Sequence, residues 1–191
     1  MRLIYNKIFA KKIRVGICEM DEHPGIPTKE KHRLHTLSLA SRLLGIKDIE
    51  IAYNGRIPCL VNQPWNVSVS HSGNHLACIL TDLPHAGIDI EQISPRIEKI
   101  ANRFLHESEK KTISGKNRLE KLYVIWCAKE TLYKIFKKGG LIFSENLIID
   151  PFEYSKKGEI SGAIQTKDFV RKFYLFYEEF RGHILVFGAN E

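Results

Sequence analysis

The sequence has no long apolar run and little that could cross-link it. No stretch of apolar residues approaches the roughly 20 that a membrane-spanning helix needs. Asn6 and Lys7 interrupt the N-terminal stretch and no small-residue cleavage site follows it, so we expect no signal peptide. The chain contains only four cysteines in 191 residues, and none of them form a C-x-x-C pair. Because this is no disulfide framework, we expect reduced thiols in a cytoplasmic protein.

The composition indicates a folded chain with a positive charge. Apolar residues make up 43 % and charged residues 27 %, which is typical of globular proteins and excludes extended disorder. Lysine and arginine number 29 against 22 acids, for a net charge of +7, and the excess is spread over both halves. Such a charge favours an acidic partner, which could be a nucleic acid, an anionic membrane surface, a phosphorylated ligand or an acidic protein.

Hydrophobic periodicity predicts an α+β fold with two similar halves. One helix is expected from Thr28 to a cap at Gly45, and a longer one over 117–138, ending at Gly139-Gly140. Short strand-like runs surround both helices. We therefore predict two α+β lobes, residues 1–86 and 87–191, each with a long helix packed on a small, mostly antiparallel sheet. Strands are expected at 2–8, 13–20, 49–54, 65–70, 75–81, 87–91, 141–149, 159–165, 172–180 and 183–188, and short helices at 97–105 and 106–114.

Two acids alternate in the run Gly87-Ile-Asp-Ile-Glu91. Side chains two apart in a strand share a face, so Asp89 and Glu91 point outward while the isoleucines point into the core. Adjacent carboxylates repel each other, and a divalent cation such as Mg²⁺ relieves that repulsion. The alternative is an ordinary amphipathic edge strand with solvated acids.

The long second helix carries a second set of polar side chains. Trp126, Glu130 and Lys134 are spaced four residues apart and share one face, with Lys129 beside it. Glu130 could serve as a third metal ligand or as a general base. The alternative is a Glu-to-Lys pair on the helix surface, which would stabilise the helix slightly.

A third candidate is the turn that contains Ser70 and His71. Hydroxyls, turn N–H groups and an imidazole make a suitable seat for a phosphate, although a lone histidine at a turn is more often structural. The remaining histidines show no metal-ligand spacing. His32 and His35 lie three residues apart without an acid or cysteine to complete a site, so we interpret them as structural or surface residues.

Basic residues near the first helix form a fourth candidate. Arg33 follows Lys29 and Lys31 at the start of the helix, where side chains and helix N–H groups together could hold a phosphate. Arg56 follows the turn Asn54-Gly55. The alternative is a solvated helix face.

The order and spacing of these segments resemble the 4′-phosphopantetheinyl transferase family. The resemblance rests on S-H-S-G at 70–73, G-I-D-I-E at 87–91 and W-x-x-K-E-x-x-x-K at 126–134. It is strongest to the two-lobed branch that activates surfactin synthetase. That resemblance implies a pseudo-dimer of two α+β lobes in one chain, with the active site between them. It also implies transfer of the 4′-phosphopantetheine arm from coenzyme A to a serine of an acidic apo carrier protein, with release of 3′,5′-ADP.

The resemblance also implies roles for individual residues. Mg²⁺, or Mn²⁺, would be the metal. The sequence departs from the family pattern at Gly55-Arg56-Ile57-Pro58, which has one residue more than the usual Gly-Lys/Arg-Pro. Glu109 matches a family acid whose role is open. The metal ligands would be Asp89, Glu91 and Glu130, the catalytic residues Asp89, Glu130 and Lys134, and the cofactor-binding residues Arg33, Arg56, Ser70, His71, Lys129 and Lys134.

Two other classes of function also fit the charge and the acids. A metal-dependent phosphatase or nuclease would use clustered carboxylates and a basic surface, and a non-catalytic nucleic-acid-binding protein would use the basic surface alone. The family resemblance implies neither a nucleic acid nor a membrane as partner. Because one chain would supply both halves of the site, it also implies a monomer.

Overall fold

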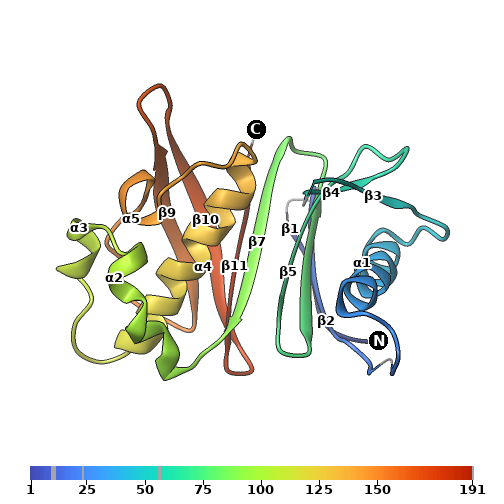
Figure 1. The fold of residues 1–191 in the computed structure, drawn as a ribbon, viewed down its shortest axis with the longest axis horizontal. Coiled ribbons are helices and arrows are strands. Elements are labelled where there is room, and N and C mark those ends of the chain that lie inside the picture. Colours follow the sequence, from blue (N-terminus) through green and yellow to red (C-terminus); the bar gives the residue numbers. More distant parts are fainter. Residues whose placement is uncertain (10–11, 23, 56, 191) are drawn as a thin grey trace. The chain divides into compact units, whose positions relative to one another are not determined.

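A computed structural model describes residues 1–9, 12–22, 24–55 and 57–190. The chain forms two compact units, Met1–Ile88 with Ala189–Glu191, and Asp89–Gly188 (Figure 1). The expected α+β class is confirmed, because each unit combines a sheet with one long helix. Strand β7 (His85–Gln92) passes from the first unit into the second. Across the described ranges, no helix is both long and apolar enough to cross a membrane.

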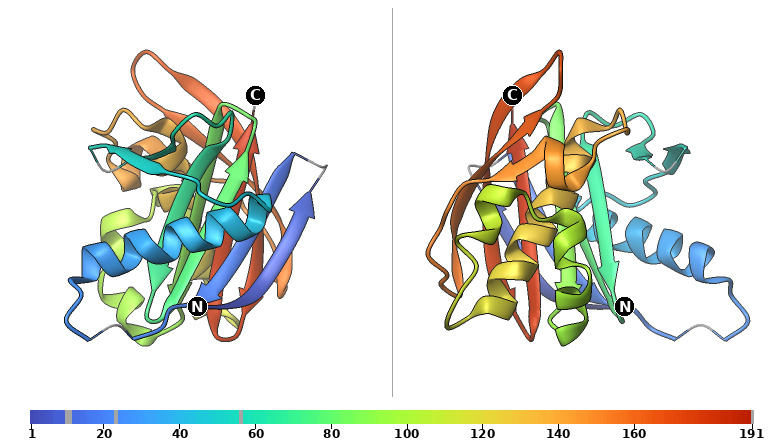
Figure 2. Two further views of the ribbon diagram at one scale, coloured as in Figure 1. Left: turned by 90° about the vertical axis from the view of Figure 1, so that its right-hand side faces the viewer. Right: turned by 60° about the vertical axis from the view of Figure 1, so that its left-hand side comes forward.

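The first unit is built on a four-stranded antiparallel sheet. Its strands lie in the order β1-β2-β6-β5. Helix α1 (Thr28–Leu44) packs across one face of this sheet, against β2 and β6 (Figure 2). The strands are β1 (Arg2–Phe9), β2 (Ile13–Glu19), β5 (Asn66–Ser72) and β6 (His75–Thr81).

A glycine in β2 leaves room for helix α1 to lie close to its sheet. A Cβ at Gly16 would lie 2.8 Å from a methyl carbon of Leu43, so with a larger residue there the Leu43 side chain would have to move. Leu39, Ala40 and Leu43 form the buried face of the helix. The helix ends where the sequence predicts, because Gly45 adopts a left-handed conformation with φ of 70° and its N–H donates to the carbonyl of Ser41.

A short hairpin lies between α1 and β5. It pairs β3 (Ile51–Asn54) with β4 (Ile57–Leu60). Only the first of these strands was expected. The second is four residues long and contains Pro58, a residue that sequence rules treat as a strand breaker because it lacks an N–H donor.

The second unit is built on a five-stranded sheet in the order β7-β11-β10-β9-β8. The pairings of β8 with β9, β9 with β10 and β10 with β11 are antiparallel. Helix α4 (Arg118–Phe136) packs against β8, β9 and β10, and its apolar residues form the core of the unit. The remaining strands are β8 (Leu147–Ile149), β9 (Lys157–Gln165), β10 (Val170–Phe180) and β11 (His183–Asn190).

The short helices of this unit differ from the prediction. The stretch expected as two helices divides into the 3-10 helix η1 (Pro95–Lys99), α2 (Ala101–Phe104) and α3 (Glu107–Lys110). The strand expected at 141–149 is half helix, α5 (Phe143–Asn146), before β8 begins. Helix α4 ends at Phe136, two residues earlier than predicted, because Lys137 takes a left-handed conformation with φ of 60° and its N–H donates to the carbonyl of Tyr133.

A fully buried ion pair lies inside the second unit. The Lys129 ammonium nitrogen is 2.7 Å from Oε2 of Glu109, and these side chains are 0 % and 2 % exposed. Lys129 also donates to the carbonyl of Phe104 at 2.7 Å and to that of Phe143 at 3.0 Å. Its three hydrogens therefore have three oxygen partners, which join α4 to α2, α3 and α5.

Glu109 is held by two backbone donors in addition to Lys129. The N–H of His106 donates to Oε2 and the N–H of Ile149 donates to Oε1, each at 2.8 Å. The first of these bonds belongs to the capping box that begins α3. Burial lowers the pKa of Lys129, and the nearby Glu109 carboxylate opposes that shift.

Replacing Lys129 with methionine tests this ion pair. We expect Lys129→Met to lower the free energy of unfolding by about 3–5 kcal/mol, because a buried carboxylate is left without its cation. Urea denaturation measures the loss. The matched control is Lys110→Met, whose ammonium pairs with Glu107 at the surface and should matter little. Equal stabilities of the two variants would contradict the assignment.

Candidate active site

Asp89 and Glu91 lie on the part of β7 that belongs to the second unit. The expected alternation is present, because Ile88 and Ile90 are fully buried. The expectation that Asp89 is an outward-facing acid is wrong, since its exposed fraction is only 3 %. Its Oδ1 atom accepts a hydrogen bond from the ammonium of Lys134 at 2.8 Å. A nearly buried carboxylate of this kind needs a cationic neighbour, and Lys134 supplies one.

Helix α4 places Trp126, Glu130 and Lys134 on successive turns of one face. Burial, followed by the negative charge of Asp89, raises the pKa of Glu130 to about 7, while Lys134 acts in the opposite direction. Glu91 adds a smaller upward effect. The strand acids and the helix acid therefore lie close enough to feel one another's charge.

The thiol of Cys127 reports the same accumulation of negative charge. Burial raises its pKa well above the ordinary value, and the carboxylates of Asp89 and Glu91 raise it further. Among the residues that the structure describes, no three histidine, cysteine, aspartate or glutamate side chains form a ready-made metal centre. The donors are nevertheless hard carboxylate oxygens that repel one another. Such a set fits Mg²⁺, which is usually held by one or two carboxylates together with water and phosphate oxygens.

A cavity of about 420 Å³ adjoins Glu130. The ring of Trp126 lies 5.2 Å from that of Phe104 and 5.5 Å from that of Phe143, measured between centroids. These rings make the cavity largely apolar, with Arg103 and Glu130 as its charged members. An uncharged substrate group in this cavity would lie next to the Glu130 carboxylate.

Lys129 and Glu109 do not line that cavity directly. Lys129 was predicted to bind the cofactor, but its ammonium is fully buried and already holds three oxygen partners. The structure gives it a supporting role instead, since two of those partners are the carbonyls of the cavity residues Phe104 and Phe143. Glu109, whose role was open, is the counter-ion for this lysine.

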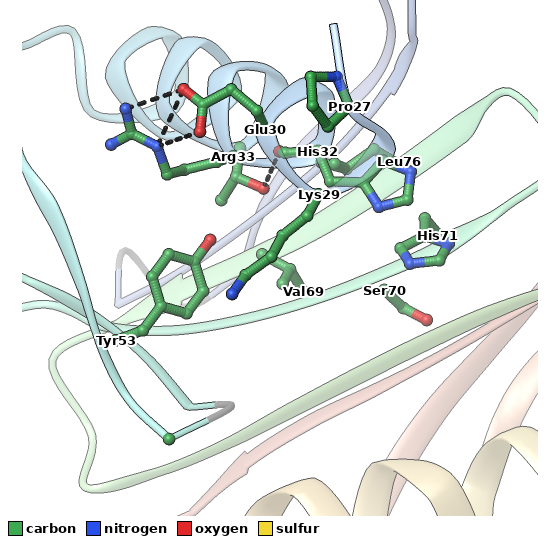
Figure 3. A pocket seen from close by; sticks show the side chains of 12 residues that line it. Pro27, Lys29, Glu30, His32, Arg33, Tyr53, Val69, Ser70, His71 and Leu76 are labelled. Carbon is green, nitrogen blue, oxygen red and sulfur yellow. Dashed lines mark hydrogen bonds and ion pairs between the residues drawn. The ribbon is translucent and has the colours of Figure 1, made fainter.

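A second, larger cavity of about 910 Å³ lies in the first unit (Figure 3). Ser70 and His71 reach it from β5, and Arg33 reaches it from α1. Three of the predicted cofactor-binding residues thus line one cavity. The fourth residue predicted for this part of the chain, Arg56, lies outside the described residues.

Arg33 is paired within its own helix. Its guanidinium hydrogen-bonds the carboxylate of Glu30, with Nη2 3.0 Å from Oε1, and Figure 3 shows it turned toward Glu30 and away from His71. That contact raises the pKa of Arg33 and lowers the pKa of Glu30. Because Nε and Nη2 donate to Glu30, Arg33 would have to leave that carboxylate to offer these donors to an anionic ligand.

The cavity also contains residues that sequence reasoning left out. His32 was interpreted as structural or surface, yet its ring lies 4.0 Å from the ring of His71, measured between centroids. Tyr53 enters from β3 and is 42 % exposed. A helical signal was present in the sequence, because four of the five α1 residues that line the cavity follow the i, i+3, i+4, i+7 spacing of one helix face. These four are Lys29, His32, Arg33 and Thr36, and the fifth is Glu30.

Comparison with known proteins agrees with the resemblance seen in the sequence. The family model of the 4′-phosphopantetheinyl transferase superfamily matches residues 85–185, more than half of the chain. This range contains the acids of β7 and the polar face of α4, and it excludes α1 and β5.

Individual relatives carry names from the same family. The chain is 34 % identical over 86 residues to 4′-phosphopantetheinyl transferase gsp of Aneurinibacillus migulanus, covering 44 % of this chain and 36 % of the relative. It is 27 % identical over 125 residues to 4′-phosphopantetheinyl transferase AcpT of Escherichia coli K12, covering 63 % of each. The matches thus span about one third to less than two thirds of these relatives. On the strength of the family match, this chain belongs to the 4′-phosphopantetheinyl transferase superfamily.

Proposed function

We propose that this chain transfers the 4′-phosphopantetheine arm of coenzyme A to a serine hydroxyl of an apo carrier protein. The serine oxygen forms a bond to the phosphorus that carries the pantetheine, and the bond from that phosphorus to the bridging oxygen breaks. The serine proton is lost, and 3′,5′-ADP leaves with the bridging oxygen. The observation that carries the proposal is the family match over residues 85–185, which includes Asp89, Glu130 and Lys134.

The arrangement of charges in the second unit supports this chemistry. Transfer at phosphorus needs positive charge beside the phosphates and a group that accepts the proton of the nucleophile. We assign the first task to Lys134, whose ammonium already lies beside Asp89. We assign proton acceptance to Glu130, one helical turn away. When bound to Asp89, Glu91 and Glu130, Mg²⁺ would neutralise charge on the pyrophosphate.

The cavity of the first unit supports the binding of a phosphorylated nucleotide. We propose that Ser70 and His71 contact its phosphate and that Lys29 adds positive charge at the cavity wall. We further propose that Arg33 joins them after it leaves Glu30. Tyr53 offers an exposed aromatic face on which a base could stack.

The net charge is compatible with the proposed partner. An acidic carrier protein would be attracted to a chain with a net charge of +7, which speeds encounter at low ionic strength. We also propose that the chain acts as a monomer in the cytoplasm. All four cysteines are free thiols, which is compatible with that compartment.

Intact mass spectrometry of a carrier protein tests the proposed reaction. We expect incubation of an apo acyl or peptidyl carrier with this protein, coenzyme A and Mg²⁺ to add the mass of one phosphopantetheine arm. EDTA should prevent the addition, because it removes the cation. A carrier in which the acceptor serine is replaced by alanine should stay unmodified.

The proposal predicts that at least one carrier of the fatty-acid, polyketide or nonribosomal-peptide type gains the phosphopantetheine arm. If none gains the arm and coenzyme A also fails to bind, the transferase assignment is wrong. Release of inorganic phosphate from coenzyme A under these conditions would instead favour a phosphatase.

Replacing Asp89 with asparagine tests the acidic site. We expect Asp89→Asn to reduce transfer by about 100-fold or more, because the site loses a carboxylate that would hold Mg²⁺ beside the reacting phosphates. The substitution keeps the size of a side chain that is only 3 % exposed, so the melting temperature should stay close to that of the unchanged protein. The matched control is Asp168→Asn, an exposed position in the turn between β9 and β10. Equal activity in both variants would remove Asp89 from the proposed machinery.

Replacing Glu30 with glutamine tests the partner exchange of Arg33. We expect Glu30→Gln to tighten coenzyme A binding a few-fold, because the guanidinium no longer has to leave a carboxylate. Calorimetric titration measures the dissociation constant. Glu22→Gln, at an exposed position that does not line the cavity, is the control. Unchanged or weaker binding by Glu30→Gln would show that Arg33 does not reach the ligand.

A further inference from the structure

Two imidazole rings are in contact with each other at the wall of the cavity of the first unit. His32 comes from α1 and His71 from β5, and their ring centroids are 4.0 Å apart with an interplanar angle of 38° (Figure 3). Both backbones are held by regular structure. Thr36, one helical turn after His32, donates from Oγ1 to the carbonyl of His32 at 2.8 Å. Strand β5, which carries His71, is paired with β6 along its length. The contact therefore joins two fixed elements.

The surroundings of this histidine pair, His32 and His71, carry more positive than negative charge. Two lysines and a third histidine come from the same helix, where the Glu30 carboxylate is engaged with Arg33. Strand β3 contributes a tyrosine, and β6 contributes only the apolar Leu76 to the cavity wall. Within the described residues, the charged and titratable groups around the pair are Lys29, Glu30, Lys31, Arg33, His35 and Tyr53.

We propose that His32 and His71 act together as the seat of a phosphate monoester and take up a proton when that phosphate binds. The inference rests on the proposed function, in which coenzyme A occupies this cavity, and it assigns His32 a part in holding its 3′-phosphate. The pair makes the site selective for the dianion of a monoester over a phosphodiester, which carries only one negative charge.

The direction of the proton transfer follows from the charges. Two imidazolium rings at this distance repel each other, so the pair resists carrying two protons in the absence of ligand. Burial lowers the pKa of His32, and the charge of His71 and then that of Lys31 lower it further. A phosphate dianion next to both rings favours their charged forms. Binding therefore takes up a proton, and affinity increases as the pH falls toward the second pKa of the phosphate, near 6.

Calorimetry with two ligands that differ by one phosphate tests the proposal. Coenzyme A and 3′-dephosphocoenzyme A are titrated into the full chain in HEPES and in Tris, because these buffers differ in ionisation enthalpy and so reveal the protons taken up. At pH 7.5 with Mg²⁺, we expect the protein to take up more protons when it binds coenzyme A than when it binds the dephospho form. Uptake of one proton corresponds to about a tenfold loss of affinity per pH unit above neutrality.

The variant His32→Asn separates the pair from His71 acting alone. We expect it to lose at least half of the extra proton uptake and to bind coenzyme A with a flatter pH profile, while its binding of the dephospho form changes little. The matched control is His106→Asn, at the N-cap of α3 in the second unit, where asparagine preserves the cap and the uptake should be unchanged.

The possible failures are distinguishable. Equal proton uptake for the two ligands, or full uptake by His32→Asn, overturns the role of the histidine pair even when the carrier protein is still modified. No binding of coenzyme A together with no modification of any carrier overturns the proposed function, and this inference with it.

Discussion

The buried contact between Lys129 and Glu109 is the interaction on which the architecture of the second unit depends. It places an ammonium where no water reaches it, and the cost of that burial is offset only because three oxygens surround the charge. Those oxygens belong to α2, α3 and the start of α5, which are too short to be stable alone. The lysine thus gives three fragments of helix a common attachment to α4.

This attachment lies one residue from Glu130 along the helix. The carbonyls that Lys129 binds belong to Phe104 and Phe143, whose rings meet Trp126 and form the cavity beside the Glu130 carboxylate. Neighbouring residues of α4 therefore have different roles. Lys129 faces inward and fixes the walls, while Glu130 and Lys134 carry charge toward Asp89.

Much of this could be predicted from the sequence, and the failures have physical causes. Periodicity located α1 and α4, and alternation placed Asp89 and Glu91 on one face of a strand. Neither pattern reveals what lies opposite a side chain, so the burial of Asp89 and its contact with Lys134 were missed. The contact of His32 with the cavity residue His71 was missed for the same reason, since the two histidines are 39 positions apart in the sequence. Four-residue elements such as α5 and β4 are too short for periodicity to show.

One of the four thiols is exposed and can be labelled selectively, because the other three are buried. Burial raises the pKa of Cys18 to about 11, and Cys78 and Cys127 are shifted in the same direction, so all three stay protonated and inert toward alkylating reagents near neutral pH. Cys59 is exposed on β4, in the hairpin whose other strand supplies Tyr53 to the larger cavity. A single dye can therefore be attached there without mutagenesis, and its emission would follow ligand entry in real time.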